Sequence, residues 1–438
     1  MRLSKSQSAV IILLNVIIAL LLCFIFLFPQ LLVTAPPKGD GDTPNDVPGI
    51  VDPHEKLRAA KPGKTSDILR ETQLMGSGDE TVLGAYNVDG NIYIFGNATV
   101  GDYDFDDYGG FLCVIESDGK IARFEYFTGR MTAVAVVENG FAVATVAEAG
   151  TQRERNILYE VGDAVRETAE LDGTALDVLA VDPGRIAVVI KKNDNCIRLT
   201  EYAISDGKYN RDRSTDVSSG YDLDYFDCYI LGERYIVTAR ARSLPRYDSI
   251  MFFVFEAGGD PIVHTYGGSG ESLLQPYAVM PYEKGYIVLA RRGGTATVIG
   301  VDYSFKSYKR DLLDFAFDDA KLVHDGKNYY ACFITGGSAV TYALDDELKT
   351  GEKITALDGA TLDKATNEPS LFFAVTGSAL SVISKVDGGK TTLELAGATV
   401  FACFINSDGT ETVVISASGG NAVSAPIGGK DIYVLALR

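Results

Sequence analysis

Tryptophan is absent from this sequence of 438 residues, and histidine occurs only three times, as His54, His264 and His324. These histidines lie far apart in the chain, so the sequence predicts neither a histidine-rich metal site nor a serine–histidine–aspartate catalytic set. No residue is therefore assigned a catalytic role.

Positive charge is also scarce. Lys and Arg number 40 against 59 Asp and Glu, which gives a formal net charge of −19 at pH 7. Nucleic acid is excluded as a partner, because binding a phosphate backbone requires cations that displace its counterions. Flat association with an anionic membrane surface is excluded for a similar reason.

The cysteines follow no zinc or redox spacing. Cys23 lies in an apolar N-terminal run, and five others are widely spaced in strand-like stretches: Cys113, Cys196, Cys228, Cys332 and Cys403. Five thiols cannot all pair with one another, so at least one is expected to be free. Buried thiols are favoured over a disulfide framework, and the disulfide state stays open.

A long apolar run occupies Ala9–Phe28 and is interrupted by a single asparagine. Twenty helical residues span about 30 Å, the thickness of a hydrocarbon core. Arg2 and Lys5 precede the run and acidic residues follow it. The positive-inside rule then places residues 1–8 in the cytoplasm, a single-pass anchor at 9–33, and the rest of the chain outside the cell.

A cleaved signal peptide is the alternative, because Val33-Thr34-Ala35 has the small residues of a cleavage site. Two features favour a retained anchor. The apolar run is longer than the ~7–15 residues of a signal-peptide core, and Pro36 would directly follow the cut.

Residues 34–65 carry prolines at six positions, with Gly and Asp between them. This composition cannot bury enough apolar surface to fold, so it predicts a disordered tether. Proline favours extended conformations, and the tether is therefore expected to be a semi-stiff spacer.

Residues 66–438 alternate between short apolar runs and turns, and no stretch has a convincing helical period. The runs fall into groups of four, as in Thr132–Glu138, Phe141–Ala147, Asn156–Val161 and Ala164–Leu171. The groups recur every ~40–50 residues, the length of a propeller blade. We therefore expect an all-β propeller of about eight four-stranded blades, with seven as the alternative.

The two ends of this domain fit a closed ring. The last group has only three runs, Thr399–Ile405, Thr412–Ser416 and Asp431–Arg438, while Asp67–Leu74 stands unattached at the start. The N-terminal strand is predicted to complete the C-terminal blade, which removes an open sheet edge.

Several segments resemble a known family. Tyr266–Glu271 (YGGSGE) precedes Gly285–Ala290 (GYIVLA), and Gly428–Val434 (GGKDIYV) matches another part of the same unit. These segments resemble the repeats of secreted bacterial β-propeller proteins, in which a GGSG-type turn precedes a GYIV-type strand. The resemblance implies a fold and an extracellular address, and no single activity. The lack of tryptophan departs from quinone-dependent dehydrogenase propellers, WD-type propellers and sialidase Asp-box repeats.

Basic residues gather where the second strands of three consecutive groups end. When these strands are aligned, the sixth residue of each is basic: Lys191, Arg240 and Arg291. Two further arginines, Arg242 and Arg292, follow closely. In propellers these strand ends open onto one face, beside the loops that join blades. We call the five residues the basic arc and predict that they bind carboxylate or phosphate groups of a ligand. Internal pairing with Asp222 and Asp224 is the alternative.

An acidic loop carries alternating carboxylates at Asp102, Asp104 and Asp106. Such an arrangement resembles the start of a calcium loop, because Ca²⁺ prefers several hard oxygen ligands. The glutamate expected at position twelve is missing, since Cys113 stands there. Calcium binding is one hypothesis for this loop, and a solvated loop is the other.

Two segments have the Ser-x-x-Lys spacing of penicillin-interacting enzymes, Ser117–Lys120 and Ser205–Lys208. Each lies between the third and fourth strands of a group and contains Asp-Gly, so both are predicted to be hairpin turns. Asn97-Ala98-Thr99 fits a glycosylation sequon, to which we assign no function.

These features favour a membrane-tethered, extracytoplasmic binding module that recognises a protein or a cell-envelope glycan on one face of the propeller. The alternative is an envelope hydrolase or lyase with carboxylates in the propeller channel. A third hypothesis is a structural spacer or assembly partner in a membrane complex. The sequence names no reaction and suggests no cofactor besides calcium.

Overall fold

The computed structural model describes residues 58–62, 67–74, 80–98, 109–138, 140–151, 153–205, 208–243, 247–256, 259–266, 274–335, 338–354, 361–365, 371–384, 389–406, 409–426 and 429–437. The chain divides into two compact units, 1–51 and 52–438, and all described residues belong to the second. The anchor predicted at 9–33 lies outside the described residues. Within them, no helix is long and apolar enough to cross a membrane.

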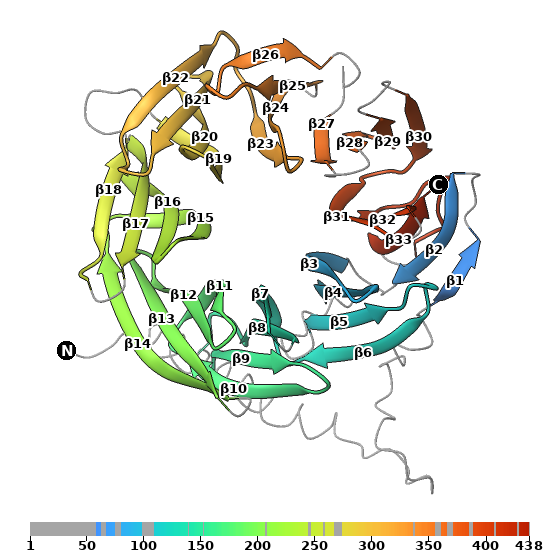
Figure 1. The fold of residues 1–438 in the computed structure, drawn as a ribbon, viewed down its shortest axis with the longest axis horizontal. Coiled ribbons are helices and arrows are strands. Elements are labelled where there is room, and N and C mark those ends of the chain that lie inside the picture. The colour runs from blue at the N-terminus through green and yellow to red at the C-terminus, as the bar shows by residue number, and fades with distance from the viewer. Residues whose placement is uncertain are drawn as a thin grey trace, which may run out of the picture. The chain divides into compact units, whose positions relative to one another are not determined.

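The second unit is an eight-bladed β-propeller, in which eight antiparallel sheets are arranged in a ring (Figure 1). Blade 1 contains β3 (Glu80–Val88), β4 (Asn91–Ala98), β5 (Gly110–Ile115) and β6 (Ile121–Phe127). Blade 2 contains β7 (Arg130–Val137), β8 (Gly140–Ala147), β9 (Arg155–Val161) and β10 (Val165–Leu171). Blade 3 contains β11 (Thr174–Asp182), β12 (Arg185–Asn193), β13 (Cys196–Ser205) and β14 (Lys208–Ser218).

The same order, from inner to outer strand, continues around the ring. Blade 4 contains β15 (Asp222–Leu231), β16 (Arg234–Ser243), β17 (Tyr247–Glu256) and β18 (Ile262–Tyr266). Blade 5 contains β19 (Leu274–Tyr282), β20 (Gly285–Arg292), β21 (Thr295–Asp302) and β22 (Ser307–Leu313). Blade 6 contains β23 (Asp319–His324), β24 (Tyr329–Thr335), β25 (Ser338–Leu344) and β26 (Thr350–Lys353). Blade 7 contains β27 (Thr361–Ala365), β28 (Leu371–Thr376), β29 (Ala379–Ser384) and β30 (Lys390–Glu394).

Blade 8 joins the two ends of the propeller, as the sequence predicted. Its three C-terminal strands are β31 (Thr399–Ile405), β32 (Glu411–Ala417) and β33 (Asp431–Leu437). The N-terminal β2 (Ile68–Leu74) pairs with β33 as the fourth strand, and β1 (Arg58–Pro62) lies outside it as a fifth. Strand β1 falls inside residues 34–65, the stretch that composition assigned to a disordered tether. Part of that stretch therefore forms a sheet edge.

The apolar cores lie between neighbouring blades. Second strands are buried on both faces, as in β12, where Ile186–Ile190 is fully buried, which explains their continuous apolar sequences. Between blades 1 and 2, the ring centroids of Phe95 and Phe141 are 4.7 Å apart. Each blade is thus held mainly by its two neighbours, and an open ring would leave two such faces in water.

Seven of the eight inner strands contain a register shift near their first residues: β3, β7, β11, β15, β19, β27 and β31. In β19 the ladder passes from Pro276 to Ala278, and in β27 from Leu362 to Lys364. A bulge of this kind leaves one residue unpaired and re-aims its side chain. The residues left out in these two strands are Tyr277 and Asp363, and both have a special role below.

The predicted hairpin at Ser117–Lys120 is confirmed. Glu116 N donates to Lys120 O, and Gly119 N donates to Glu116 O, both at 2.8 Å. Gly119 has a φ of 87°, a conformation that glycine adopts without strain. The second Ser-x-x-Lys turn includes residues 206–207, which lie outside the described residues.

The corresponding turn of blade 5 places Phe305 where blade 1 has glycine. Phe305 N donates to Asp302 O at 2.8 Å, and Phe305 has a φ of 61°. This left-handed conformation is unfavourable for a bulky residue. The ring is buried between Tyr286, at a centroid distance of 5.9 Å, and His264, at 4.5 Å. The side chain therefore joins blades 4 and 5 despite a strained backbone.

Replacing Phe305 by alanine is expected to lower the free energy of unfolding by about 3–5 kcal/mol, the usual cost of removing a buried phenylalanine ring. Urea denaturation measures the change. Phe305→Gly is the matched control, since it removes the same ring but relieves the backbone strain, and it should be the less destabilised of the two by about 1 kcal/mol. A loss below about 1 kcal/mol in Phe305→Ala would contradict the packing role.

The five described cysteines are all free thiols. Burial raises the pKa of Cys332 and of Cys403 to about 12 in each case. The prediction of buried, unpaired thiols is therefore confirmed for Cys113, Cys196 and Cys332, while Cys228 and Cys403 are half-buried.

Candidate functional site

The basic arc lies at matching ends of three second strands. In the ladders, Lys191 of β12 is opposite Thr174, Arg240 of β16 is opposite Asp224, and Arg291 of β20 is opposite Gln275. The three basic residues are opposite different partners on the inner strands.

In blades 3 and 4 the basic side chains are paired with carboxylates. Lys191 Nζ lies 2.9 Å from Asp194 Oδ1. Arg240 donates to both oxygens of Asp224, from Nε at 2.6 Å and from Nη2 at 2.8 Å, and Arg242 forms an ion pair with the same carboxylate. Asp224 is one of the two partners that the internal-pairing alternative named. A ligand anion would have to displace it from a bidentate contact.

In blade 5 the arrangement is different. The guanidinium carbon of Arg291 lies 5.1 Å from the centroid of the Tyr277 ring and 5.6 Å from that of Phe317. Arg291 forms no ion pair with any carboxylate among the described residues, and its Nε is buried without a hydrogen-bond partner there. Its neighbour Arg292 is half-buried. The positive charge of Arg291 is therefore not neutralised by a described carboxylate and is instead in contact with two aromatic rings.

Tyr277 and Phe317 form the aromatic support of the Arg291 guanidinium. Tyr277 is the residue that the β19 bulge leaves unpaired, and its hydroxyl donates to Gln275 Oε1 at 3.4 Å. Phe317 lies between β22 and β23, at the start of blade 6, and is 2% exposed. The two rings meet edge to face at 4.8 Å. A cation above such rings is stabilised by about 0.5–2 kcal/mol, so the guanidinium is positioned before any ligand arrives.

The equivalent position in blade 1 is Asn97, the residue of the sequon. Its Nδ2 donates to Met131 O at 3.0 Å, and Met131 N donates to its Oδ1 at 2.7 Å. Both halves of the amide thus bind the backbone of blade 2. A glycan on Nδ2 would break this link between blades 1 and 2.

A second group of titratable side chains lies on the inner strands β11 and β15. The pKa of Asp177 is raised to about 6, mainly by burial and to a smaller extent by the negative charge of Asp227, although Val178 N donates to Asp177 Oδ1 at 2.8 Å. Cys228 lies beside both carboxylates, and burial raises its pKa well above the ordinary value. A carboxylic acid that titrates near neutral pH can exchange protons with a substrate.

The three carboxylates proposed for calcium, Asp102, Asp104 and Asp106, lie outside the described residues. Within the part of the propeller that the structure describes, no group of three or more His, Cys, Asp or Glu residues could hold a metal ion. Calcium binding by the acidic loop stays a prediction.

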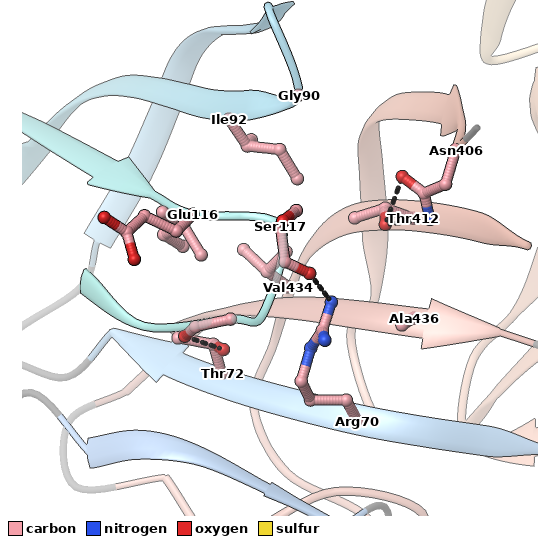
Figure 2. A pocket seen from close by; sticks show the side chains of 12 residues that line it. Arg70, Thr72, Gly90, Ile92, Glu116, Ser117, Asn406, Thr412, Val434 and Ala436 are labelled. Atoms are coloured by element: carbon pink, nitrogen blue, oxygen red, sulfur yellow. Dashed lines mark hydrogen bonds between the residues drawn. The ribbon is translucent and has the colours of Figure 1, made fainter. Parts of the chain in front are cut away.

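A small pocket lies where β2 meets blade 1 (Figure 2). Its volume is about 10 Å³, which leaves room for one water molecule at most. Arg70 Nη2 donates to Ser117 O at 2.6 Å, and Thr72 Oγ1 donates to Gly119 O at 2.9 Å. These two hydrogen bonds join the closing strand β2 to the first blade. The pocket beside them is too small for a ligand.

Comparison with known proteins yields structural likeness only. No family model matches the chain, and no curated protein matches it. The WD40 domain of SCAP from fission yeast is similar over 91% of this chain and 97% of that one, at 10% identity and a TM-score of 0.49. The Dos1 propeller covers 87% of this chain and 94% of its own, at 11% identity and a TM-score of 0.47.

A prolyl endopeptidase is similar over 77% of this chain, at 11% identity and a TM-score of 0.48. The match covers 54% of the endopeptidase, so it spans about half the length of that enzyme. Likenesses this distant say nothing about activity, and the β-propeller architecture rests on the strands and sheets described above.

Proposed function

We propose that this chain is a membrane-tethered, extracytoplasmic binding module that holds an anionic group of a protein or envelope ligand at Arg291. The observation that carries the proposal is the environment of that guanidinium, which rests on two aromatic rings and pairs with no described carboxylate. The single-pass anchor and the extracellular address are parts of the same proposal.

The contacts divide the basic arc into two kinds of residue. Arg240 and Arg242 share Asp224, so an incoming anion gains little from them. Arg291 offers a charge that is partly removed from water and already oriented. Its terminal nitrogens can bind a carboxylate or phosphate through two parallel hydrogen bonds. We therefore assign ligand binding to Arg291, with Arg292 as a second source of positive charge.

The test is a thermal-shift and binding titration of the purified chain with poly-glutamate, polyphosphate and muropeptides. A ligand that binds the folded state raises the melting temperature by mass action. Arg291→Ala should weaken binding about 10- to 100-fold, since hydrogen bonds to charged groups are worth about 1.5–3 kcal/mol. Arg291→Lys should recover part of the loss.

Arg240→Ala is the matched control, because it removes an equivalent arginine that Asp224 already pairs. Its effect on affinity should stay within about threefold. If Arg240→Ala weakens binding as much as Arg291→Ala, or if none of the probes binds, the assignment to Arg291 is wrong.

The carboxylates of the inner strands β11 and β15 support a second candidate function, an envelope hydrolase or lyase. Asp177 and Asp227 interact electrostatically, and the raised pKa of Asp177 suits a general acid near neutral pH. Assay of envelope glycans with the parent chain and with Asp177→Asn tests this alternative. Turnover that depends on Asp177 would favour the enzyme over the binding module.

A further inference from the structure

Strand β1 is surplus to the closure of the ring. Seven blades have four strands, and β2 already supplies the fourth strand of blade 8. β1 instead covers the outer edge of β2, with Arg58 opposite Gln73, Lys61 opposite Glu71 and Pro62 opposite Arg70. The register shifts between Arg58 and Lys61, so the ladder is short and irregular.

The outer strands of several other blades carry exposed charges, although Arg123 and Glu125 of β6 are half-buried. The exposed charged residues of β10, β14 and β30 are Arg166, Glu167, Glu170, Lys208, Arg211, Asp212, Asp216, Lys390 and Glu394. Solvated charges at a sheet edge discourage the addition of another strand. β18 lacks charged residues, but Asp260 and Pro261 directly precede it, and proline has the same effect.

The edge of β2 has no comparable protection, because its polar side chains bind other parts of the protein. Arg70 and Thr72 donate to the turn of blade 1. Glu71 accepts a hydrogen bond from Ser424 N at 3.0 Å, and Gln73 donates to Asp431 Oδ2 at 2.7 Å. What β2 still exposes is Leu69, at 40%. The two charged side chains of β2 are thus already bound, Glu71 in a buried contact and the half-buried Arg70 to Ser117 O, so an extended segment can pair with this edge without displacing an unbound charge.

We propose that the outer edge of β2 is a strand-addition site, and that β1 of a second copy of this chain can occupy it in place of the resident β1. The second copy carries an identical segment, so the exchanged strand forms the same backbone ladder and needs no new interface. Four residues, 63–66, separate β1 from Asp67. Because this connection is short, the resident β1 has a high effective concentration at its own β2. Exchange between two copies therefore requires a high protein concentration, or a connection too short for β1 to pair with the β2 of its own chain.

The first test removes residues 63–66 from the full-length chain in detergent, so that β1 cannot return to its own β2. Light scattering after size exclusion should then report a dimer where the parent is monomeric. Adding Lys61→Pro, which interrupts the β1 ladder, should restore the monomer. A folded monomer after the deletion, or a dimer that persists with Lys61→Pro, would overturn the proposal.

A second test does not depend on the folding of the deletion variant. A fluorescent peptide of residues 55–64 is titrated into the parent and into the Lys61→Pro variant, in which the edge of β2 is open. The variant should bind the peptide at least about tenfold more tightly than the parent, whose edge is filled. Equal binding, or no binding to either protein, would show that the edge accepts no added strand.

Discussion

Removal of residues 1–79, which contain β1 and β2, is expected to abolish the cooperative unfolding transition of the propeller. Without β2, β33 loses its outer partner and blade 8 keeps three strands. Ile68 and Leu74 are 3% and 2% exposed and contribute to two different cores. The buried side chain of Asp431 would also lose the hydrogen bond from Gln73. Unfolding free energies are typically about 5–15 kcal/mol, and these losses together approach that range.

Three N-terminal truncations test this prediction, and circular dichroism during heating monitors the unfolding of each one. A chain that begins at residue 58 keeps both strands, and one that begins at residue 67 keeps β2 alone. Both should melt cooperatively and within about 5 °C of each other, because a change of about 1 kcal/mol shifts a domain's melting temperature by only a few degrees. A chain that begins at residue 80 should show no sharp transition. Cooperative melting of that shortest chain near the temperature of the others would contradict closure by β2.

Replacement of Asp363 by alanine is expected to lower the free energy of unfolding by about 2–4 kcal/mol. Leaving the buried Val400 N without an acceptor costs about 1–3 kcal/mol, and loss of the half-exposed ion pair with Lys321 adds about 1 kcal/mol. Asp363 is 8% exposed and is the residue that the β27 bulge leaves unpaired. Its two carboxylate oxygens accept hydrogen bonds from Lys321 Nζ in blade 6 and from Val400 N in blade 8. One side chain of blade 7 thus links three consecutive blades.

Asp363→Asn is the matched control for this prediction, because it keeps the shape and one acceptor oxygen but loses the charge. It should be less destabilising than Asp363→Ala. Lys321→Met should cost less than either, since the Lys321 side chain is 40% exposed and the remaining Asp363 still accepts from Val400. Urea denaturation of the variants measures these differences. An Asp363→Ala protein within about 1 kcal/mol of the parent would rule out the proposed link.

The candidate site illustrates how far the sequence could lead. Aligned second strands identified Lys191, Arg240 and Arg291 as equivalent, and the ladders place them at matching strand ends. The sequence did not predict that Tyr277 and Phe317 contact the Arg291 guanidinium. Tyr277 reaches Arg291 because of a bulge, and Phe317 comes from the next blade, so no local sequence pattern marks either one.

The amino-acid sequence by itself determined the repeat length, the four-stranded unit and the closure by an N-terminal strand. These features follow from alternating apolar residues and turn dipeptides, which act over a few residues and recur along the chain. Only the tertiary structure decided that there are eight blades, that Asp224 neutralises Arg240 while aromatic rings support Arg291, and that Asp363 joins three blades. These outcomes depend on bulges and on contacts between separate blades, where a shift of one residue changes the partner that a side chain meets.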